Sequence, residues 1–253
     1  MVIARPGKNT SHQCGTSDVR EPASILPQVG VGGGIPTPKN PRAASIMMAT
    51  PKCVVAIAAV LLGTTTGSLW GLASGYIGGS FDTVSQRIIE FLQSFPDLIL
   101  AMAISMALGT GHGTVIVAIA ITRIPFGGRI VRAVALSLKE MAYVEAARAI
   151  GSSPLRIMAR HILPQCVAPY LILASTHLGV AIIIEAALGF LGVGIPPPTP
   201  TWGNMLAGSL TSLVPHWWLV FFPGLAITIT VLAFNLFGDG IRDTLDPRLR
   251  GTR

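Results

Sequence analysis

The chain has 253 residues, of which 51% are hydrophobic and only 11% are charged, and its formal net charge is +7. Soluble globular proteins have about 25% charged residues, so this composition excludes an ordinary water-soluble enzyme or binding domain. The mean hydropathy is +0.63, and residues 186–238 contain no Asp, Glu, Lys or Arg. The chain is therefore expected to be an integral membrane protein.

Residues 1–52 are rich in Gly, Pro, Ser and Thr and contain no apolar run long enough for a membrane span or a signal peptide. This composition predicts a disordered polar segment. Its GVGGGIPTP stretch lacks the Gly-Lys-Ser/Thr of a phosphate-binding loop, so we interpret it as part of a flexible tail.

Five later stretches approach the roughly 20 apolar residues that a helix needs to cross a bilayer. They are residues 53–75, 88–109, 114–136, 165–191 and 217–237. The third is the least regular, because Arg123, Pro125, Gly127 and Gly128 interrupt it. The alternating strands of a membrane barrel are absent from the sequence pattern. We therefore predict an all-α polytopic fold with about five spans.

Glycines recur every four residues along the first expected span, at Gly63, Gly67, Gly71 and Gly75. A helix face made of glycine lets another helix approach closely in a membrane. The alternative interpretation is that membrane helices simply tolerate glycine well. Trp202, Trp217 and Trp218 flank the last expected external segment and are interpreted as anchors at the membrane interface.

A charged segment, EAARAIGSSPLRIMARHILP, lies between the third and fourth expected spans. Its first helix has an apolar face at helical spacing, formed by Met141, Val144, Ala147 and Ile150. Gly151 fits the left-handed residue that ends a helix, and Ser153 and Pro154 fit the N-cap and first position of the next. Pro164 marks the end of that second helix or a kink in it. Such a loop either docks into a groove on a soluble partner or lies on anionic lipid.

The basic residues of the chain indicate which side of the membrane this loop occupies. The loop carries six of them, Arg129, Arg132, Lys139, Arg148, Arg156 and Arg160, whereas residues 192–215 carry none. Loops rich in Lys and Arg stay on the cytoplasmic side, so we expect the loop to be cytoplasmic. Counting spans backward then places residues 1–52 outside, against the same rule, because they are also basic.

The three cysteines and five histidines form no spacing typical of a disulfide framework or a zinc site. We interpret Cys14, Cys53 and Cys166 as small packing residues and expect no metal site, no cofactor and no nucleic-acid partner.

The loop resembles the cytoplasmic signature of the permease subunits of binding-protein-dependent ABC importers, in the dipeptide, oligopeptide and nickel subgroup. That signature combines Glu-Ala-Ala, a Gly after a short spacer and a later Leu-Pro, here Glu145, Ala146, Ala147, Gly151, Leu163 and Pro164. The tripeptide recurs at residues 185–187 without the rest of the pattern. Residues 75–101, 196–206 and 222–250 also resemble the subgroup, and the last range resembles its second permease.

The resemblance implies a type I ABC importer transmembrane domain at residues 53–250, with a cytoplasmic coupling loop at 137–164. It also implies a bacterial inner-membrane location and a set of partners: ATP-binding subunits, a second permease subunit, an external substrate-binding protein and membrane lipid. The chain has no Walker-type phosphate loop, so ATP hydrolysis is expected in a separate subunit. The family's first span and the external segment after it have no counterpart here, so we expect a replaced or truncated start.

Ionisable residues at membrane depth are costly and often functional, which makes Glu90, Asp97, Arg123 and Glu185 candidates for the translocation pathway. Three of them have a stated structural alternative: Glu90 at the membrane interface, Asp97 capping a helix broken at Pro96, and Arg123 snorkelling or paired.

Alternatives to a working peptide importer are a nickel importer permease, a membrane scaffold or sensor, and a nonfunctional truncated remnant. Copurification with an ATP-binding subunit separates the importers from the scaffold, and restored uptake separates them from the remnant.

Overall fold

The computed structural model describes residues 41–210 and 217–245, and every regular element within these ranges is helical, which confirms the predicted all-α fold. In chain order the helices are α1 (Pro41–Ile77), α2 (Gly79–Gln93), α3 (Asp97–Leu108), α4 (His112–Lys139), α5 (Ala142–Ala149), α6 (Pro154–Ile157), α7 (Leu163–Phe190), α8 (Trp202–Leu210) and α9 (Trp217–Leu245). A π-helical turn, Met158–Ile162, joins α6 to α7.

Four helical segments are long and apolar enough to cross a membrane, and they confirm four of the five expected spans. They are Cys53–Ile77, His112–Lys139, Pro154–Phe190 and Trp217–Leu245. Helix α1 itself begins earlier, at Pro41. Residues 1–40 lie outside the described part of the chain, as does most of the polar segment expected there.

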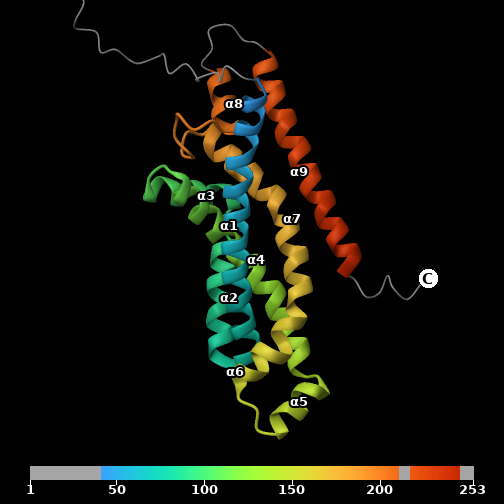
Figure 1. The fold of residues 1–253 in the computed structure, drawn as a ribbon. Helices are drawn as coiled ribbons and strands as arrows, with labels where there is room; N and C mark the ends of the chain where they lie inside the picture. Colours follow the sequence, from blue (N-terminus) through green and yellow to red (C-terminus); the bar gives the residue numbers. More distant parts are fainter. Residues whose placement is uncertain (1–40, 211–216, 246–253) are drawn as a thin grey trace, which may run out of the picture. The chain divides into compact units, whose positions relative to one another are not determined.

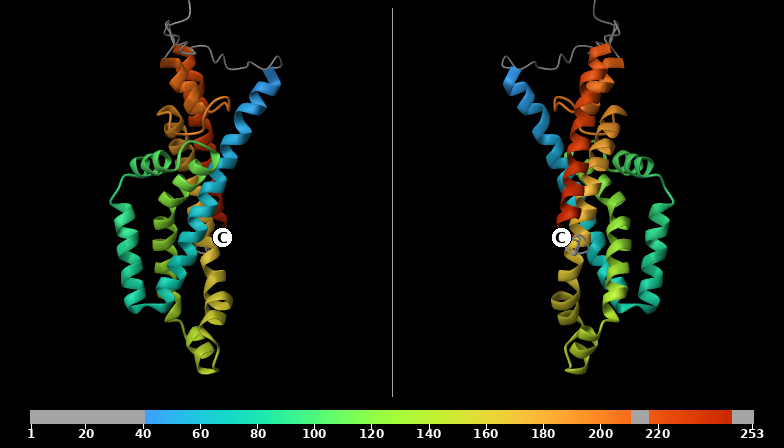
Figure 2. Two further views of the ribbon diagram at one scale, coloured as in Figure 1. Left: turned by 90° about the vertical axis from the view of Figure 1, so that its left-hand side faces the viewer. Right: turned by 90° about the vertical axis from the view of Figure 1, so that its right-hand side faces the viewer.

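The second expected span, residues 88–109, is wrong as a single helix. The chain forms α2 and α3 instead, and the two helices meet at an angle of 90°. Pro96 explains the break, because proline has no backbone N–H and disfavours a helical conformation at the residue before it. The turn between the two helices is plain in Figure 2, where α3 runs across the direction of α2.

The third expected span is a single helix, α4, despite the residues that interrupt its apolar sequence. Its partner is α1, and the glycine face of α1 makes their close approach possible. A Cβ atom at Gly63, Gly67 or Gly71 would overlap the backbone of α4, at the carbonyl groups of Ala120, Ile124 and Gly128 respectively. The predicted close helix contact is therefore confirmed, and α4 places its own Gly127 and Gly128 in the same interface.

The buried apolar side chains form two clusters. The larger contains residues of α1, α3, α4 and α7 together with Trp202 at the start of α8. Trp202 is therefore a core residue, and the interpretation of its side chain as an interface anchor is wrong; Trp217 and Trp218 are exposed. The smaller cluster joins the ends of α1 and α4 to α5, α6 and the start of α7.

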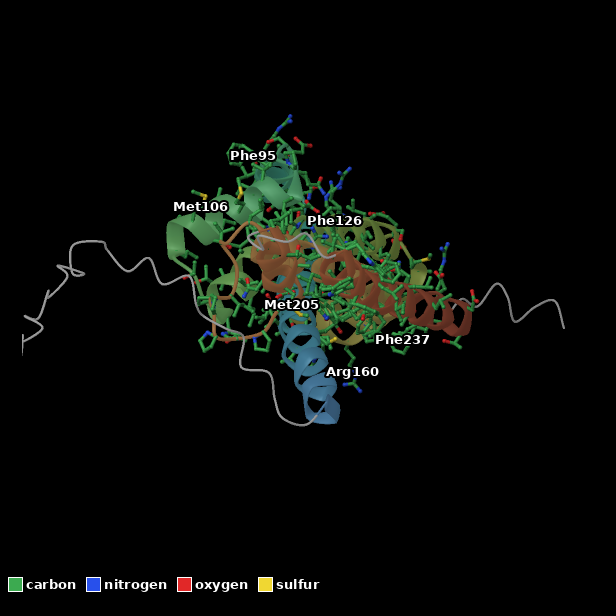
Figure 3. The ribbon with its side chains drawn as sticks, turned by 90° about the horizontal axis from the view of Figure 1, so that it is seen from above. Phe95, Met106, Phe126, Arg160, Met205 and Phe237 are labelled. Carbon is green, nitrogen blue, oxygen red and sulfur yellow. The ribbon has the colours of Figure 1, made fainter. Side chains whose placement is uncertain are left out.

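Helix α9 buries little of its surface within the described chain. Only Pro223 and Gly238 of this helix are buried, while large apolar side chains such as Phe222 and Phe237 are exposed. Figure 3 shows the chain from above, with Phe237 of α9 on one side of Phe126. On the other side lie Phe95, between α2 and α3, and Met106 of α3. An apolar surface of this kind requires lipid or another apolar helix to cover it.

Candidate functional site

The segment between α4 and α7 folds into the two short helices that the sequence predicts, α5 and α6. Figure 1 shows both helices at one end of α4 and α7, at the opposite end from α8. Gly151 follows α5 with φ +80°, the left-handed conformation that glycine adopts at low cost. The N–H of Ser152 donates to the carbonyl of Ala147 at 3.1 Å, which closes the helix end. Ser153 is the N-cap of α6 in position, although its side chain makes no capping hydrogen bond.

The expected apolar face of α5 is divided between the inside and the outside of the chain. Val144 and Ala147 are buried in the smaller core cluster, as predicted for such a face. Met141 and Ile150 are exposed instead, and Ile150 is 82% exposed. The reason is that α5 is short and packs only its middle turn against α4 and α6, which leaves both of its ends facing outward.

The outer side of this loop has apolar and charged side chains together. We call it the loop surface and define it by Met141, Tyr143, Glu145, Ala146, Arg148, Ile150, Leu155 and Arg156, all of which are exposed. Leu155, at the start of α6, is 73% exposed. Exposed aliphatic groups beside charged ones are typical of a surface that a partner covers.

Two aromatic contacts attach the loop to the helices below it. The guanidinium of Arg148 lies 5.7 Å from the ring centroid of Tyr76 at the end of α1, within the range of a cation–π interaction. The rings of Tyr143 and His161 are stacked with centroids 6.5 Å apart. Together with the buried Val144, these contacts join α5 to α1 and to the π-helical turn that precedes α7.

Leu163 and Pro164, the Leu-Pro of the signature, begin α7 and are exposed. Pro164 was expected to end a helix or to kink it. It does not end the helix, because α7 begins at Leu163 and continues through Pro164, directly after a π-helical turn. A proline removes the N–H that would bond to the carbonyl four residues earlier, here Arg160, and a locally widened turn accommodates that loss.

A clamp of polar side chains joins α1, α2 and α4. Arg132 donates two hydrogen bonds to Asp82, from Nε to Oδ1 and from Nη2 to Oδ2, each at 2.6 Å. The hydroxyl of Ser74 donates to the same carboxylate at 2.5 Å. A two-point contact between guanidinium and carboxylate is among the strongest polar contacts in proteins.

We expect Arg132→Gln to lower the free energy of unfolding by about 1–3 kcal/mol, because the half-buried Asp82 loses its charged partner. The matched control is Arg87→Gln, since Arg87 pairs with Glu90 but is 78% exposed. An exposed pair contributes within about 1 kcal/mol, so the control should change stability little. Thermal unfolding of the two purified variants measures the change in stability. Equal destabilisation by Arg132→Gln and Arg87→Gln would contradict a stabilising role of the Asp82–Arg132 contact.

A second charged group lies among the spanning helices, and it brings two of the candidate pathway residues together. Arg123 of α4 has a side chain only 1% exposed and forms an ion pair with Asp97, the first residue of α3, whose side chain is 37% exposed. The other branch of the guanidinium, Nη1, lies 3.0 Å from Nδ1 of His177 in α7. The ring of Phe126 lies beneath the guanidinium at 5.0 Å.

The other candidate pathway residues do not join this group. Glu90 pairs with Arg87 of its own helix at 2.9 Å on an exposed face. Glu185 is buried within α7. Asp97 lies in the first turn of α3, directly after Pro96, and its side chain pairs with Arg123. The alternative for Arg123, pairing, is thereby confirmed.

His177 and Phe126 were not among the residues that the sequence singled out. The rule that draws attention to ionisable residues at membrane depth applies to His177 as well, because it lies in the middle of an apolar span. The Asp82–Arg132 clamp has no sequence signal of this kind, since the two residues are far apart in the chain.

Residues 63–251 match the family model described as the binding-protein-dependent transport system inner membrane component. The chain belongs to this family. The match includes both helices of the loop, α4, and the group formed by Arg123, Asp97 and His177.

Curated relatives agree with the family. The chain is 46% identical over 196 residues to a putative peptide transport system permease protein of Brucella suis, covering 78% of this chain and 66% of that protein. It is 44% identical over 208 residues to the glutathione transport system permease protein GsiD of Pectobacterium atrosepticum, covering 81% and 68% respectively. The chain thus matches about two thirds of the length of these relatives.

The fold agrees with that of solved transporters. A chain of the MetNI methionine ABC transporter aligns with a TM-score of 0.60, covering 80% of this chain and 98% of the other, at 19% identity. This likeness confirms the type I importer transmembrane fold. Because the family consists of membrane components, the chain is a permease and not the ATP-hydrolysing subunit.

Proposed function

We propose that the chain is a membrane-spanning permease subunit of an ATP-driven peptide importer in the bacterial inner membrane. A separate ATP-binding subunit supplies the energy, a second permease completes the pathway, and an external binding protein delivers the peptide. The observation that supports this most directly is the two-sided loop, buried on the side of the spans and exposed on the other.

The loop residues have different parts in this proposal. Exposed Glu145 sets the register of docking, and exposed Ala146 lets the backbone of the partner approach closely. Ala147 is buried, so its part is to seat α5 on the spanning helices. Gly151 supplies the turn that presents Ile150 and Leu155 outward, and Leu163 and Pro164 connect the loop to α7.

For the pathway, Asp97 is the strongest of the four candidates. A carboxylate that is partly exposed at membrane depth avoids hydrocarbon and faces water or another protein subunit. Arg123 is buried and acts through Asp97. Glu90, with its own exposed partner, and Glu185, buried within the subunit, are weaker candidates for contact with cargo.

The printed names of the relatives favour peptide cargo over nickel. The names refer to peptide and glutathione transport, and a third relative is a probable D,D-dipeptide permease of Escherichia coli at 43% identity. Within residues 41–210 and 217–245, no group of three or more His, Cys, Asp or Glu side chains has the arrangement of a metal site. Nickel therefore remains the alternative cargo, and an assay of Ni²⁺ uptake tests it.

Copurification with the ATP-binding subunit tests the docking proposal. We expect Ile150→Asp to weaken retention of that subunit about tenfold or more, because a charge without a partner is costly in an apolar groove. Ser153→Asp is the control, since it adds the same charge at an N-cap, where Asp is favoured.

Retention unaffected by Ile150→Asp would contradict docking through the loop surface. Failure of the unmodified chain to retain any ATP-binding subunit would favour the scaffold or sensor. Uptake of a labelled dipeptide and of Ni²⁺ by a deletion strain that expresses the chain separates the two cargoes. The absence of both would favour the remnant.

A further inference from the structure

The group around Arg123 joins three helices that are far apart in the chain. We define the Arg123 cluster as Arg123 and Phe126 of α4, Asp97 of α3 and His177 of α7. The ring centroids of Phe126 and His177 lie 4.7 Å apart, so Phe126 contacts both the guanidinium and the imidazole. Among the described residues, the guanidinium has three polar contacts: Nη2 with Asp97, Nη1 with His177, and Nε with Thr122 at 3.2 Å.

The cluster lies at the middle of the spans. Arg123 is near the centre of the 28 residues of α4, and His177 is near the centre of the 28 residues of α7. At about 1.5 Å per residue such helices are roughly 42 Å long, and the hydrocarbon core of a bilayer is about 30 Å thick. Arg123 and Asp97 therefore lie at the depth of the hydrocarbon layer, where a charge without a partner is strongly unfavourable.

The guanidinium determines which ring nitrogen of His177 carries the proton. Arginine has only donors, so Nδ1 of His177 must accept, and the proton of the neutral ring is on Nε2. The guanidinium thus donates one branch to a carboxylate and the other to a neutral ring. This arrangement fixes the direction of the arginine side chain and, through it, the position of Asp97.

Helix α3 meets the Arg123 cluster at its first residue. It is turned by 90° from α2 at Pro96, and Asp97 is its first residue after the turn. Its fully buried residues are the small Ala101 and Ser105, while Met102 and Ile104 are partly buried. The ion pair is therefore a directional contact that α3 makes at the bend.

We propose that Arg123 is a positioning residue that fixes the bend between α2 and α3 and holds the Asp97 carboxylate at the surface of the pathway. His177 supports it by holding the second branch of the guanidinium. The consequence for transport rests on the proposed function, but the consequence for the position of α3 does not.

The position of α3 is measured with spin labels on Met106→Cys in α3 and Ile183→Cys in α7, both exposed in the structure. The native cysteines Cys14, Cys53 and Cys166 are replaced by alanine in this background. We expect one narrow distance distribution in the otherwise unmodified chain and a broadened or shifted distribution after Arg123→Met. The control Arg87→Met removes an exposed arginine and should leave the distribution unchanged. An unchanged distribution in Arg123→Met would overturn the proposal whatever the cargo is.

A double variant separates positioning from simple charge compensation. Arg123→Met leaves the Asp97 carboxyl at membrane depth without its partner, whereas Asp97→Asn with Arg123→Met removes both members of the ion pair and should restore the amount of folded chain. We expect uptake per folded complex to be reduced about tenfold in both, a change equivalent to about 1.4 kcal/mol, while ATP hydrolysis continues because the loop is intact. Full uptake by the double variant would show that the pair only cancels charge and would overturn the proposal. If the unmodified complex takes up no peptide, the proposed function fails, and the spin-label result still decides the position of α3.

Discussion

Gly67→Ala is expected to lower the stability of the folded chain by about 1–3 kcal/mol, equivalent to a melting temperature lower by on the order of 5 °C. The added Cβ would overlap the backbone of Ile124, and neither backbone can move without separating α1 from α4. Because these two helices also support Arg123 and the Asp82–Arg132 clamp, their separation affects both sites. Thermal unfolding of the purified chain measures the change.

Gly224→Ala in α9 is the matched control for this prediction. It is the same substitution in another long apolar helix, but nothing lies within 4 Å of the added Cβ. Alanine is the better helix former by about 1 kcal/mol, so the control should be neutral or slightly more stable. A Gly67→Ala variant as stable as Gly224→Ala would contradict the close α1–α4 contact.

Gly151→Val is expected to reduce uptake about tenfold or more while ATP hydrolysis by the assembled complex continues. Gly151 has φ +80°, and a β-branched residue is strongly disfavoured there. No neighbour lies within 4 Å of an added Cβ, so the effect comes from backbone strain and not from a clash. The strain would change the angle between α5 and α6, and with it the loop surface, although the spans are unchanged.

Gly151→Asn distinguishes backbone strain from the loss of glycine itself. Asparagine tolerates the left-handed conformation better than other non-glycine residues, so this variant should retain most of its uptake. Uptake and hydrolysis are measured in the same reconstituted vesicles. Equal uptake by the valine and asparagine variants would show that the turn at Gly151 has no part in coupling.

Local patterns in the sequence predicted most of the fold, because spans and helix ends depend on neighbouring residues. Apolar length located four spans, and Gly151 and Pro154 located the end of α5 and the start of α6. The bend at Pro96 was the main error in the fold. An apolar run that contains one proline is compatible with a kinked span as well as with two helices. The choice between them depends on contacts such as Asp97–Arg123, which no local pattern contains.

In the candidate site, too, local sequence patterns predicted some features, and others depend on contacts between distant residues. The resemblance to the permease signature singled out Glu145, Ala146 and Gly151 as candidates, but periodicity could not tell which part of α5 would be buried, because that depends on how α4 and α6 meet it. Arg123 and Asp97 were singled out separately as costly charges. That they form a pair, and that His177 completes it, follows only from the three-dimensional arrangement of α3, α4 and α7.

The central claim is that the loop surface docks on an ATP-binding subunit at the inner side of the membrane. The most direct test is a single cysteine at Ile150, which is highly exposed, labelled with a maleimide that cannot cross membranes. We predict labelling in inside-out vesicles but not in intact spheroplasts, and protection when the ATP-binding subunit is bound. Labelling only from the outer side, or no protection by the bound subunit, would contradict the claim.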